Sequence, residues 1–295
     1  MKTASLGDPL EIRGIRIEGR IAAAPIATAS ADPEGGPTAR SLDIYGRLAR
    51  CGVDLVVVEH HAVCRKGRAR VAQFRLDSDA AGEANRPMAA LFREAGCPAL
   101  VQINHAGSQI RDEALLAEKY PVQGPSEIRH PACPFPVKPR EMDASEIAAV
   151  IGSYAAAAKR AISAGYPGVQ VHACHGYLLS QFLSPVTNRR RDSYGGKIAN
   201  RARLLFEIVE AVSRRMLDAD PQAEVRLALS CPACGRDWLA TFDIVSFLWQ
   251  EITTWAQRTL LEVHQLARAY GWSESDILAL SPLRRQLYLG MIGAA

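Results

Sequence analysis

VQVHACHGYLLSQFLSPVTNRRRDSYGGKIANR, residues 169–201, is the stretch that says most about the fold and chemistry of this chain. It begins inside a short apolar run, residues 168–171, which predicts a buried strand. Two histidines and a tyrosine follow at once, namely His172, His175 and Tyr177. Side chains just beyond the carboxyl end of a parallel strand lie where α/β sheets and barrels bind ligands. We therefore expect a functional site here.

Strand and helix patterns alternate through the first 230 residues, an order typical of βα units around a parallel sheet. Five strands are expected, at residues 20–26, 54–58, 99–103, 169–171 and 225–229. Helices are expected between them, at residues 39–51, 87–95, 143–164 and 199–215. Asp143 and Glu146 form a capping-box pattern at the start of the third helix. Residues 10–17 predict a hairpin on the barrel floor, and residues 120–140 predict a long loop above the barrel.

The fold class is therefore α/β: a partial TIM (β/α) barrel of about five βα units, residues 1–230, followed by a helical segment, residues 231–295. Too few residues follow position 230 for three more units of about 30 residues each. Apolar residues recur at helical spacing over residues 244–270, and Gly271 is a plausible stop. Ser281 before Pro282 predicts a further short helix. No strand pattern is visible after residue 230.

Composition indicates a globular cytoplasmic protein without naming an activity. The chain has 295 residues, of which 48% are hydrophobic and 22% charged, so it can bury a sizeable core. Its net charge of +4 comes from scattered Lys and Arg, which does not suggest nucleic acid. No segment reaches the roughly 18 apolar residues of a membrane span. The seven cysteines lack framework spacing, so we expect reduced thiols, mostly buried or half-buried, at Cys51, Cys64, Cys97, Cys133 and Cys174.

The quoted stretch resembles the flavin-dependent old yellow enzyme family, the NADH:flavin oxidoreductases, through its HxxHGYL and QFLSPxxNxRxDxYGG signatures. The resemblance covers residues 10–230. It implies FMN as cofactor and NAD(P)H as reductant, with an enone-like small molecule whose activated C=C bond accepts the hydride. It further implies that His172 and His175 orient that acceptor and that Tyr177 delivers the proton.

The resemblance also implies a set of flavin contacts from the ends of other strands. Gln102 would place an amide on the pyrimidine edge of the ring, and Arg226 would stabilise negative charge near N1 and the C2 carbonyl. The backbone of Pro25, Ile26 and Ala27 would meet the ring, although many members carry Thr or Cys in place of Ala27. His60 falls where the family usually has a smaller residue.

Each of these residues also has an ordinary alternative. An HxxH pair in isolation is more often a metal half-site or an incidental pair, and a lone Tyr usually packs. Gln102 and Asn104 could simply cap a sheet end, and a strand Arg such as Arg226 is by default at an edge or on the surface. The NRRRDSYGG segment is expected to be structural, with ties made by Arg189, Asp192 and Arg201.

The tail raises separate hypotheses. Cys231 and Cys234 in CPACG form half of a zinc knuckle, so zinc there would need a partner chain, and the site residues include no metal ligand. CPACG, FLWQEI and LLEVHQLARAYGWSESDILALSPLRRQLYL resemble, over a short match, small helical proteins of phage-like contractile-tail gene clusters. That likeness implies an interaction module for a protein partner or a second copy. Because the phosphate-binding loops that the family places after strands seven and eight are missing, the alternative function is a catalytically inactive truncated barrel fused to this module.

Overall fold

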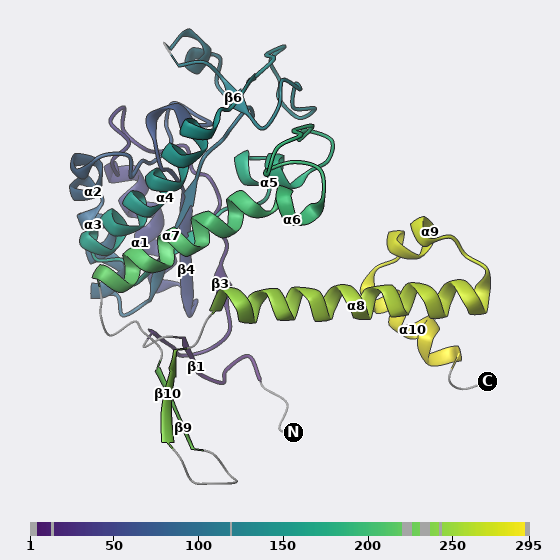
Figure 1. Cartoon of the computed structure of the whole chain (residues 1–295). Helices are drawn as coiled ribbons and strands as arrows, with labels where there is room; N and C mark the ends of the chain where they lie inside the picture. Colours follow the sequence, from purple (N-terminus) through teal and green to yellow (C-terminus); the bar gives the residue numbers. More distant parts are fainter. Residues whose placement is uncertain are drawn as a thin grey trace. The chain divides into compact units, whose positions relative to one another are not determined.

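The computed structural model describes residues 5–12, 15–118, 120–219, 226–230, 237–241 and 244–292 (Figure 1). The side chains at 217–219, 226–230, 237–241 and 244–252 lie outside this description. The chain divides into two compact units, Met1–Val225 and Arg226–Ala295. The division falls shortly before the boundary expected at residue 230, and each unit is considered by itself.

The first unit is built on a four-stranded parallel sheet with the order β3-β4-β5-β8. Its strands are β3 (Ala22–Ala23), β4 (Leu55–Ala62), β5 (Ala99–Asn104) and β8 (Gly168–Val171). These are the first four predicted strands, in the predicted order, although β4 runs four residues past its expected end at Val58. Val56, Val57, Val58, Val101 and Ile103 of β4 and β5 are buried, as is usual for a parallel sheet covered on both sides. All four carboxyl ends therefore lie at one edge.

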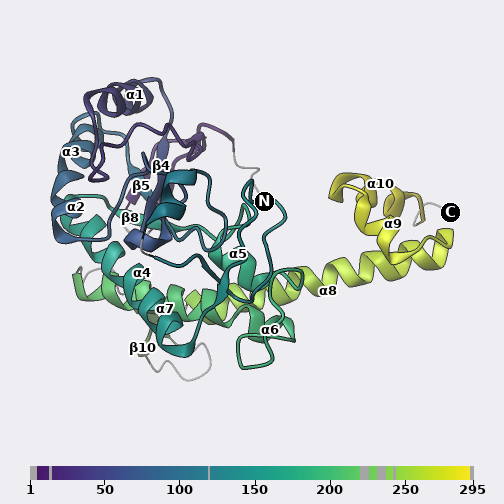
Figure 2. The same cartoon turned by 90° about the horizontal axis from the view of Figure 1, so that it is seen from above.

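Helices pack against the outer face of this sheet, and Figure 2 shows α1, α3, α2 and α4 in succession around β4, β5 and β8. The helices of the first unit are α1 (Ala39–Arg50), α2 (Asp79–Ala84), α3 (Arg86–Glu94), α4 (Ala144–Ala164), α5 (Leu178–Leu183), α6 (Ile198–Arg201) and α7 (Arg203–Ala219), with 3-10 turns at Arg65–Gly67 and Glu113–Ala117. All the predicted helices are present, the one predicted at residues 199–215 as α6 and α7, whereas α2 and α5 were not predicted. The fully buried core between helices and sheet includes Val56, Val101, Met88, Tyr154 and Leu204.

The start of α4 confirms the predicted capping box. The Asp143 carboxylate accepts a hydrogen bond from the Glu146 amide at 2.9 Å, and the Glu146 carboxylate accepts one from the Asp143 amide at 3.0 Å. Two donors that the first helical turn would leave unpaired are satisfied in this way. The helix ends at Gly165, whose φ of +105° is a conformation that glycine adopts without steric cost.

A β-bulge interrupts the pairing of β4 with β5. Val58 lies opposite Val101, and the next paired residue, His61, lies opposite Ile103. Two residues of β4, Glu59 and His60, therefore stand against one residue of β5. The Glu59 amide, released from the ladder, donates to the Tyr45 hydroxyl at 3.0 Å. The bulge places two polar side chains where a regular strand has room for one.

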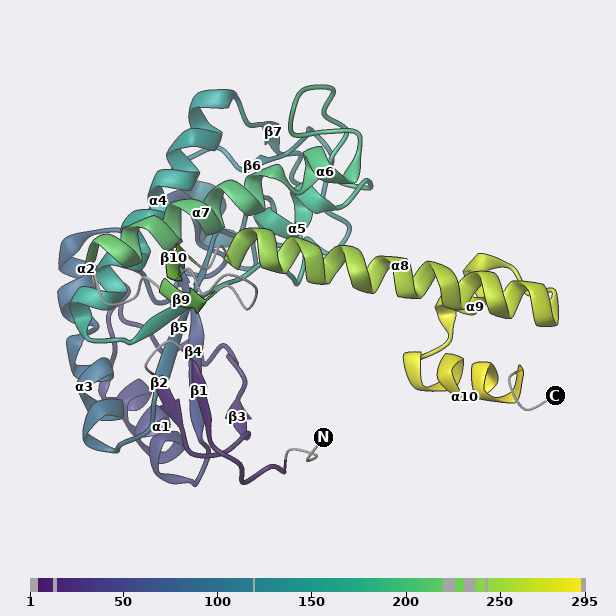
Figure 3. The same cartoon turned by 60° about the horizontal axis from the view of Figure 1, so that its bottom comes forward.

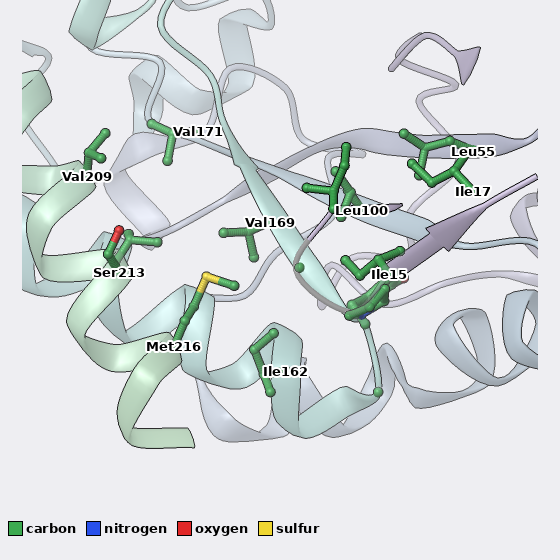
Figure 4. Close-up of a pocket in the computed structure, with 16 residues that line it drawn as sticks. Ile15, Ile17, Leu55, Leu100, Ile162, Val169, Val171, Val209, Ser213 and Met216 are labelled. Carbon is green, nitrogen blue, oxygen red and sulfur yellow. The ribbon is translucent and has the colours of Figure 1, made fainter. Parts of the chain in front are cut away.

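The predicted N-terminal hairpin is present as β1 (Leu10–Ile12) and β2 (Ile15–Ile17), which pair antiparallel at the end of the sheet where the strands begin (Figure 3). Beside it a groove of about 570 Å³ runs along β8 and α7. Figure 4 shows aliphatic side chains turned into this groove, with Ser213 as the polar exception among those labelled. Its walls come from Ile12, Ile15, Ile17, Leu55, Leu100, Ile162, Val169, Val171, Val209, Val212 and Met216. Because its lining is mostly aliphatic, the groove offers packing surface rather than chemistry.

The loop above the sheet is largely irregular, as predicted, and holds one small parallel pair, β6 (Gln123–Gly124) with β7 (Arg140–Glu141). The NRRRDSYGG segment does tie this region together, as predicted, with Arg190 as a further residue that was not predicted. Arg189 is exposed, whereas the buried Arg190 donates to the Pro125 and Met142 carbonyls at 3.1 and 2.7 Å and pairs with Asp192 at 2.5 Å. Arg201 donates to the Leu183 carbonyl at 2.7 Å, as expected of a structural residue.

The second unit corrects two sequence predictions. The predicted fifth strand is found as β9 (Arg226–Ser230), but it pairs antiparallel with β10 (Asp237–Thr241), so the parallel sheet has four described strands rather than five. A strand therefore does follow residue 230. Cys231 and Cys234 lie outside the described residues. The local pattern of β9 was read correctly, but its partner was not, because a strand pattern does not specify what the strand pairs with.

The two predicted tail helices are present as α8 (Ile244–Tyr270) and α10 (Pro282–Ile292), and α9 (Glu274–Ala279), which was not predicted, lies between them in the sequence. Gly271, with φ of +68°, ends α8 by donating to the Ala267 carbonyl at 2.8 Å. Three aromatic rings join α8 to α10: Trp272 stacks on Tyr270 with centroids 4.7 Å apart and meets Tyr288 edge-on at 5.0 Å. Among the described residues, no helix is long and apolar enough to cross a membrane.

Candidate active site

Four aromatic and imidazole side chains gather at the carboxyl edge of the parallel sheet. His172 and Tyr177 follow β8, and His60 comes from the bulge in β4. The ring centroid of His60 lies 6.2 Å from that of His172 and 5.5 Å from that of Tyr177. His172 lies 5.3 Å from Tyr177 and 5.0 Å from His175. Four of the predicted site residues are therefore brought into one cluster.

Burial sets the protonation of the two inner histidines. It lowers the pKa of His60 to about 3 and that of His172 to about 4, and in each case a neighbouring histidine adds to the effect. Both rings are therefore neutral near pH 7, and each keeps one N–H to donate. Burial also raises the pKa of Tyr177, although Arg111 and Arg70 act in the opposite direction. The phenol consequently holds its proton at neutral pH.

His175 is the exposed member of the cluster and has an unusual backbone. Its φ of +58° lies in the left-handed region that non-glycine residues seldom adopt, and Gly176 follows with φ of +72°. This turn brings Nδ1 of His175 to 3.3 Å from Nε2 of His172. Two nitrogens at that separation can both reach a single oxygen at ordinary hydrogen-bond lengths. The pair therefore has the geometry to bind one carbonyl or nitro oxygen.

The loop after β8 is fixed by a glutamine of the QFLSP motif. Gln181, which is buried, donates to the carbonyls of Gly176 and Ala106 at 2.7 and 3.0 Å. Its own carbonyl oxygen accepts from both the amide and the hydroxyl of Ser108 at 3.1 Å. All of its polar atoms are used, so it clamps the loop after β8 to the loop after β5. This role supports the His175 turn.

Gln102, on β5, is buried next to this cluster, and its amide donates to Gln170 of β8 at 2.7 Å. The two residues are direct register partners in the sheet. Asn104, also on β5, approaches His60 through its side-chain nitrogen at 3.4 Å. Its Oδ1 is buried and has no hydrogen-bond partner in the described part of the chain. An unpaired buried acceptor of this kind can be satisfied by a donor on a bound molecule.

The loop of Pro25, Ile26 and Ala27 follows β3, with Ile26 74% exposed. The structure does not bring these side chains into the histidine cluster. Their loop is held from below by Glu59, whose buried carboxylate accepts from the amide and hydroxyl of Thr28 at 3.0 and 2.5 Å and from the Tyr45 hydroxyl at 3.1 Å. Burial raises the pKa of Glu59, and the hydrogen bonds from Thr28 and Tyr45 oppose that rise.

These groups match the ring of a flavin better than its phosphate. Gln102, Gln170 and Asn104 supply amide donors and acceptors beside neutral imidazoles, which suits a ring edge that alternates donors and acceptors. Arg226, the predicted cation, has a side chain outside the described residues. The described residues contain no candidate for the phosphate cradle that the resemblance implies. The residues present thus fit FMN at its ring.

Sequence reasoning missed several residues that shape this site. Glu59 positions the loop after β3 through Thr28. Gln73 positions the His60 ring, because its side-chain amide donates to Nδ1 of His60 at 2.7 Å. The run of polar residues inside an apolar strand was a signal for Glu59, whereas nothing local marks Gln73. Cys174 and Cys51 are exposed, contrary to expectation, while Cys97 and Cys133 are buried and Cys64 is half-buried as expected.

Comparison with known proteins then identifies the family. The sequence model described as NADH:flavin oxidoreductase / NADH oxidase family matches residues 5–246. The chain belongs to the NADH:flavin oxidoreductase / NADH oxidase family. The match runs past the expected boundary at residue 230.

Among curated relatives of this family member, the NADPH dehydrogenase of Geobacillus sp. (strain WCH70) is 37% identical over 212 residues, which are 70% of this chain and 59% of the relative. The NADH oxidase of Thermoanaerobacter brockii is 34% identical over 209 residues, or 68% of this chain and 30% of that protein. The chain thus spans 59% and 30% of the lengths of these two relatives.

Solved structures of the old yellow enzyme type share the fold. The old yellow enzyme homologue from Zymomonas mobilis superposes with a TM-score of 0.65 at 28% identity, covering 72% of this chain and 60% of its own. Morphinone reductase in complex with tetrahydroNAD gives a TM-score of 0.67 at 26% identity, covering 75% of this chain and 62% of its own. The expected old yellow enzyme resemblance of the N-terminal part is confirmed.

Proposed function

We propose that the chain is an FMN-dependent oxidoreductase of old yellow enzyme type that reduces an activated C=C bond at the expense of NAD(P)H. The observation that carries the proposal is the cluster of His60, His172, His175 and Tyr177 at the carboxyl edge of the sheet. Family membership supports the redox class, and FMN with NAD(P)H are the cofactors that the family implies.

In this proposal His172 and His175 bind the carbonyl or nitro oxygen of the acceptor and polarise the conjugated double bond. They do so as neutral donors, because burial keeps the pKa of His172 near 4. Tyr177 holds a proton at its hydroxyl for the α carbon of the acceptor, as its raised pKa favours. When bound, FMN supplies the hydride-transfer chemistry between nicotinamide and acceptor.

The cofactor ring would be held by Gln102 on its pyrimidine edge and by the backbone of Pro25, Ile26 and Ala27. His60 would close the site beside the ring, where it is steadied by Gln73. Glu59 is a positioning residue, because it fixes the loop through Thr28 rather than touching the ligand. These assignments extend the family resemblance to particular residues of this chain.

The test begins with the visible absorbance of the purified chain after incubation with FMN and desalting. Retained flavin should then respond to a phenolic ligand with a shifted absorbance band. His172→Ala and His175→Ala should weaken that response at least about tenfold, the loss expected for two charge-polarising donors, while the flavin stays bound. His264→Ala, on the exposed surface of α8, is the matched control. A protein that retains no flavin, or unchanged titrations in both variants, would overturn the proposal.

A further inference from the structure

The turn after β8 brings three potential metal ligands together. His172, Cys174 and His175 each offer one ligand atom, and these atoms lie within 4.8 Å of one another. The thiol and the two imidazoles come from four consecutive residues, so the turn itself, rather than a distant contact, holds them together. Histidine nitrogen and thiolate sulfur are the ligand types that Zn²⁺ prefers.

Two of the three ligand separations match the edges of a tetrahedral zinc site. Usual Zn–N and Zn–S bond lengths place two nitrogen ligands roughly 3.3 Å apart and a nitrogen and a sulfur roughly 3.6 Å apart. Here Nε2 of His172 lies 3.3 Å from Nδ1 of His175, and Sγ of Cys174 lies 3.6 Å from the same Nδ1. The sulfur meets the His172 ring at its other nitrogen, Nδ1, at 3.3 Å, so the third edge, from the sulfur to Nε2, needs a shift of the exposed Cys174 side chain. Small rotations of exposed side chains would therefore complete the site.

The surroundings of these three residues leave a metal ion access from solvent and one coordination position free. Cys174 and His175 are exposed, whereas His172 is buried and fixed by its neighbours. Three protein ligands with one side open to solvent resemble zinc sites that keep a position for water or a substrate group. The left-handed conformation of His175 contributes directly, since it turns that imidazole back toward His172.

We propose that His172, Cys174 and His175 form a binding site for a thiophilic divalent cation of the Zn²⁺ class. Binding converts the Cys174 thiol to a metal thiolate and releases its proton to solvent. The ion takes one nitrogen lone pair from each histidine. Because the same two rings are assigned to the acceptor oxygen, metal and acceptor exclude each other. That last consequence rests on the proposed function, whereas metal binding does not.

Cobalt(II) is the probe, because it reports both coordination and thiolate ligation in its absorption spectrum. The full-length chain, stripped with chelator and kept reduced, is titrated with CoCl₂. To remove the CxxC motif as a competing ligand, the titration is repeated in a Cys231→Ala, Cys234→Ala background. Binding of one Co²⁺ per chain, with a near-ultraviolet thiolate charge-transfer band and intense visible bands, is the expected result.

Cys174→Ala should abolish the charge-transfer band and weaken Co²⁺ binding at least about tenfold, in line with the loss of a direct ligand. His175→Ala should weaken binding while leaving the fold unchanged by circular dichroism, because the side chain is exposed. Cys51→Ala is the matched control, since Cys51 is the other exposed cysteine among the described residues. A spectrum without the band in the CxxC-free background, or one that Cys174→Ala leaves unchanged, would overturn the proposal.

Zinc should also displace a phenolic ligand from the flavin-loaded chain and fail to do so in Cys174→Ala. The cobalt titration needs no flavin, so the metal site and the proposed function can fail separately. If the phenol binds neither the unsubstituted chain nor Cys174→Ala before zinc is added, that result counts against the proposed function alone. Displacement by zinc in both proteins would count against the role of Cys174.

Discussion

His105 should make this fold sensitive to mild acid. The side chain is completely buried after β5, where Nδ1 accepts a hydrogen bond from the Gly107 amide at 3.0 Å and Nε2 has no partner among the described residues. Desolvation, with a smaller contribution from Lys66, lowers the pKa of His105 from 6.5 to about 3. The folded state therefore binds no proton here at a pH where the unfolded chain already does.

The sign and size of the effect follow from that difference. Since the unfolded state binds more protons, stability falls as the pH drops below the unfolded pKa of 6.5, and the loss continues down to the folded pKa of about 3. Between about pH 7 and about pH 5 the loss from this single residue amounts to about 2 kcal/mol. Other buried histidines also lower the stability in acid. The effect of His105 is therefore measured as the difference in the free energy of unfolding between the chain and a variant without this histidine.

The assay compares the chain with His105→Asn, whose side-chain oxygen can still accept from the Gly107 amide. Urea unfolding followed by far-ultraviolet circular dichroism gives the free energy of unfolding of both at several pH values. The variant should be less stable near pH 7, because His105 packs against Gly67, and the gap should shrink by about 2 kcal/mol near pH 5. His264→Asn, on the exposed face of α8, is the control for replacing a histidine that is not buried. A gap for His105→Asn that does not change with pH would refute the reasoning.

Three further predictions concern the stability of the first unit, and thermal or urea unfolding measures each of them. Asp143→Ala should cost about 1 kcal/mol by removing the cap of α4, and Asp143→Asn should recover most of the loss. Gly195→Ala should prevent stable folding, because the new Cβ would lie 2.0 Å from the Arg190 carbonyl oxygen, whereas Gly196→Ala meets no atom within 4 Å and should cost only about 1 kcal/mol for its left-handed φ. Leu204→Ala, fully buried on α7, should cost about 2–5 kcal/mol; a smaller loss would show that the core collapses around the cavity.

The parts of the fold that sequence predicted are those set by local pattern. Residues close in sequence determine the apolar runs of β4, β5 and β8 and the cap at Asp143, so the positions of these elements could be predicted. The partner of β9 could not be predicted, because an alternating strand is compatible with parallel and antiparallel neighbours alike. Which strands meet is decided by contacts between distant segments.

The candidate site divides along the same line. His172, His175 and Tyr177 could be placed together because they follow one strand. His60 was placed through the family resemblance. Gln73 contacts His60 from a loop, and no sequence motif or spacing predicts that contact. Cys174 is exposed and His175 has a left-handed backbone conformation, and residue type alone predicts neither.

The bulge in β4 bears on how a scaffold of this kind can acquire new side chains. Val58 and His61 keep their partners on β5 although two residues lie between them and only one lies between the partners. The extra residue lets Glu59 hold the loop at Thr28 while His60 reaches toward His172. A single-codon insertion at such a position adds a functional group without disturbing the pairing on either side. Loss of that codon would remove the group and leave the sheet intact, so insertions and deletions, as well as substitutions, can alter the chemistry of this strand.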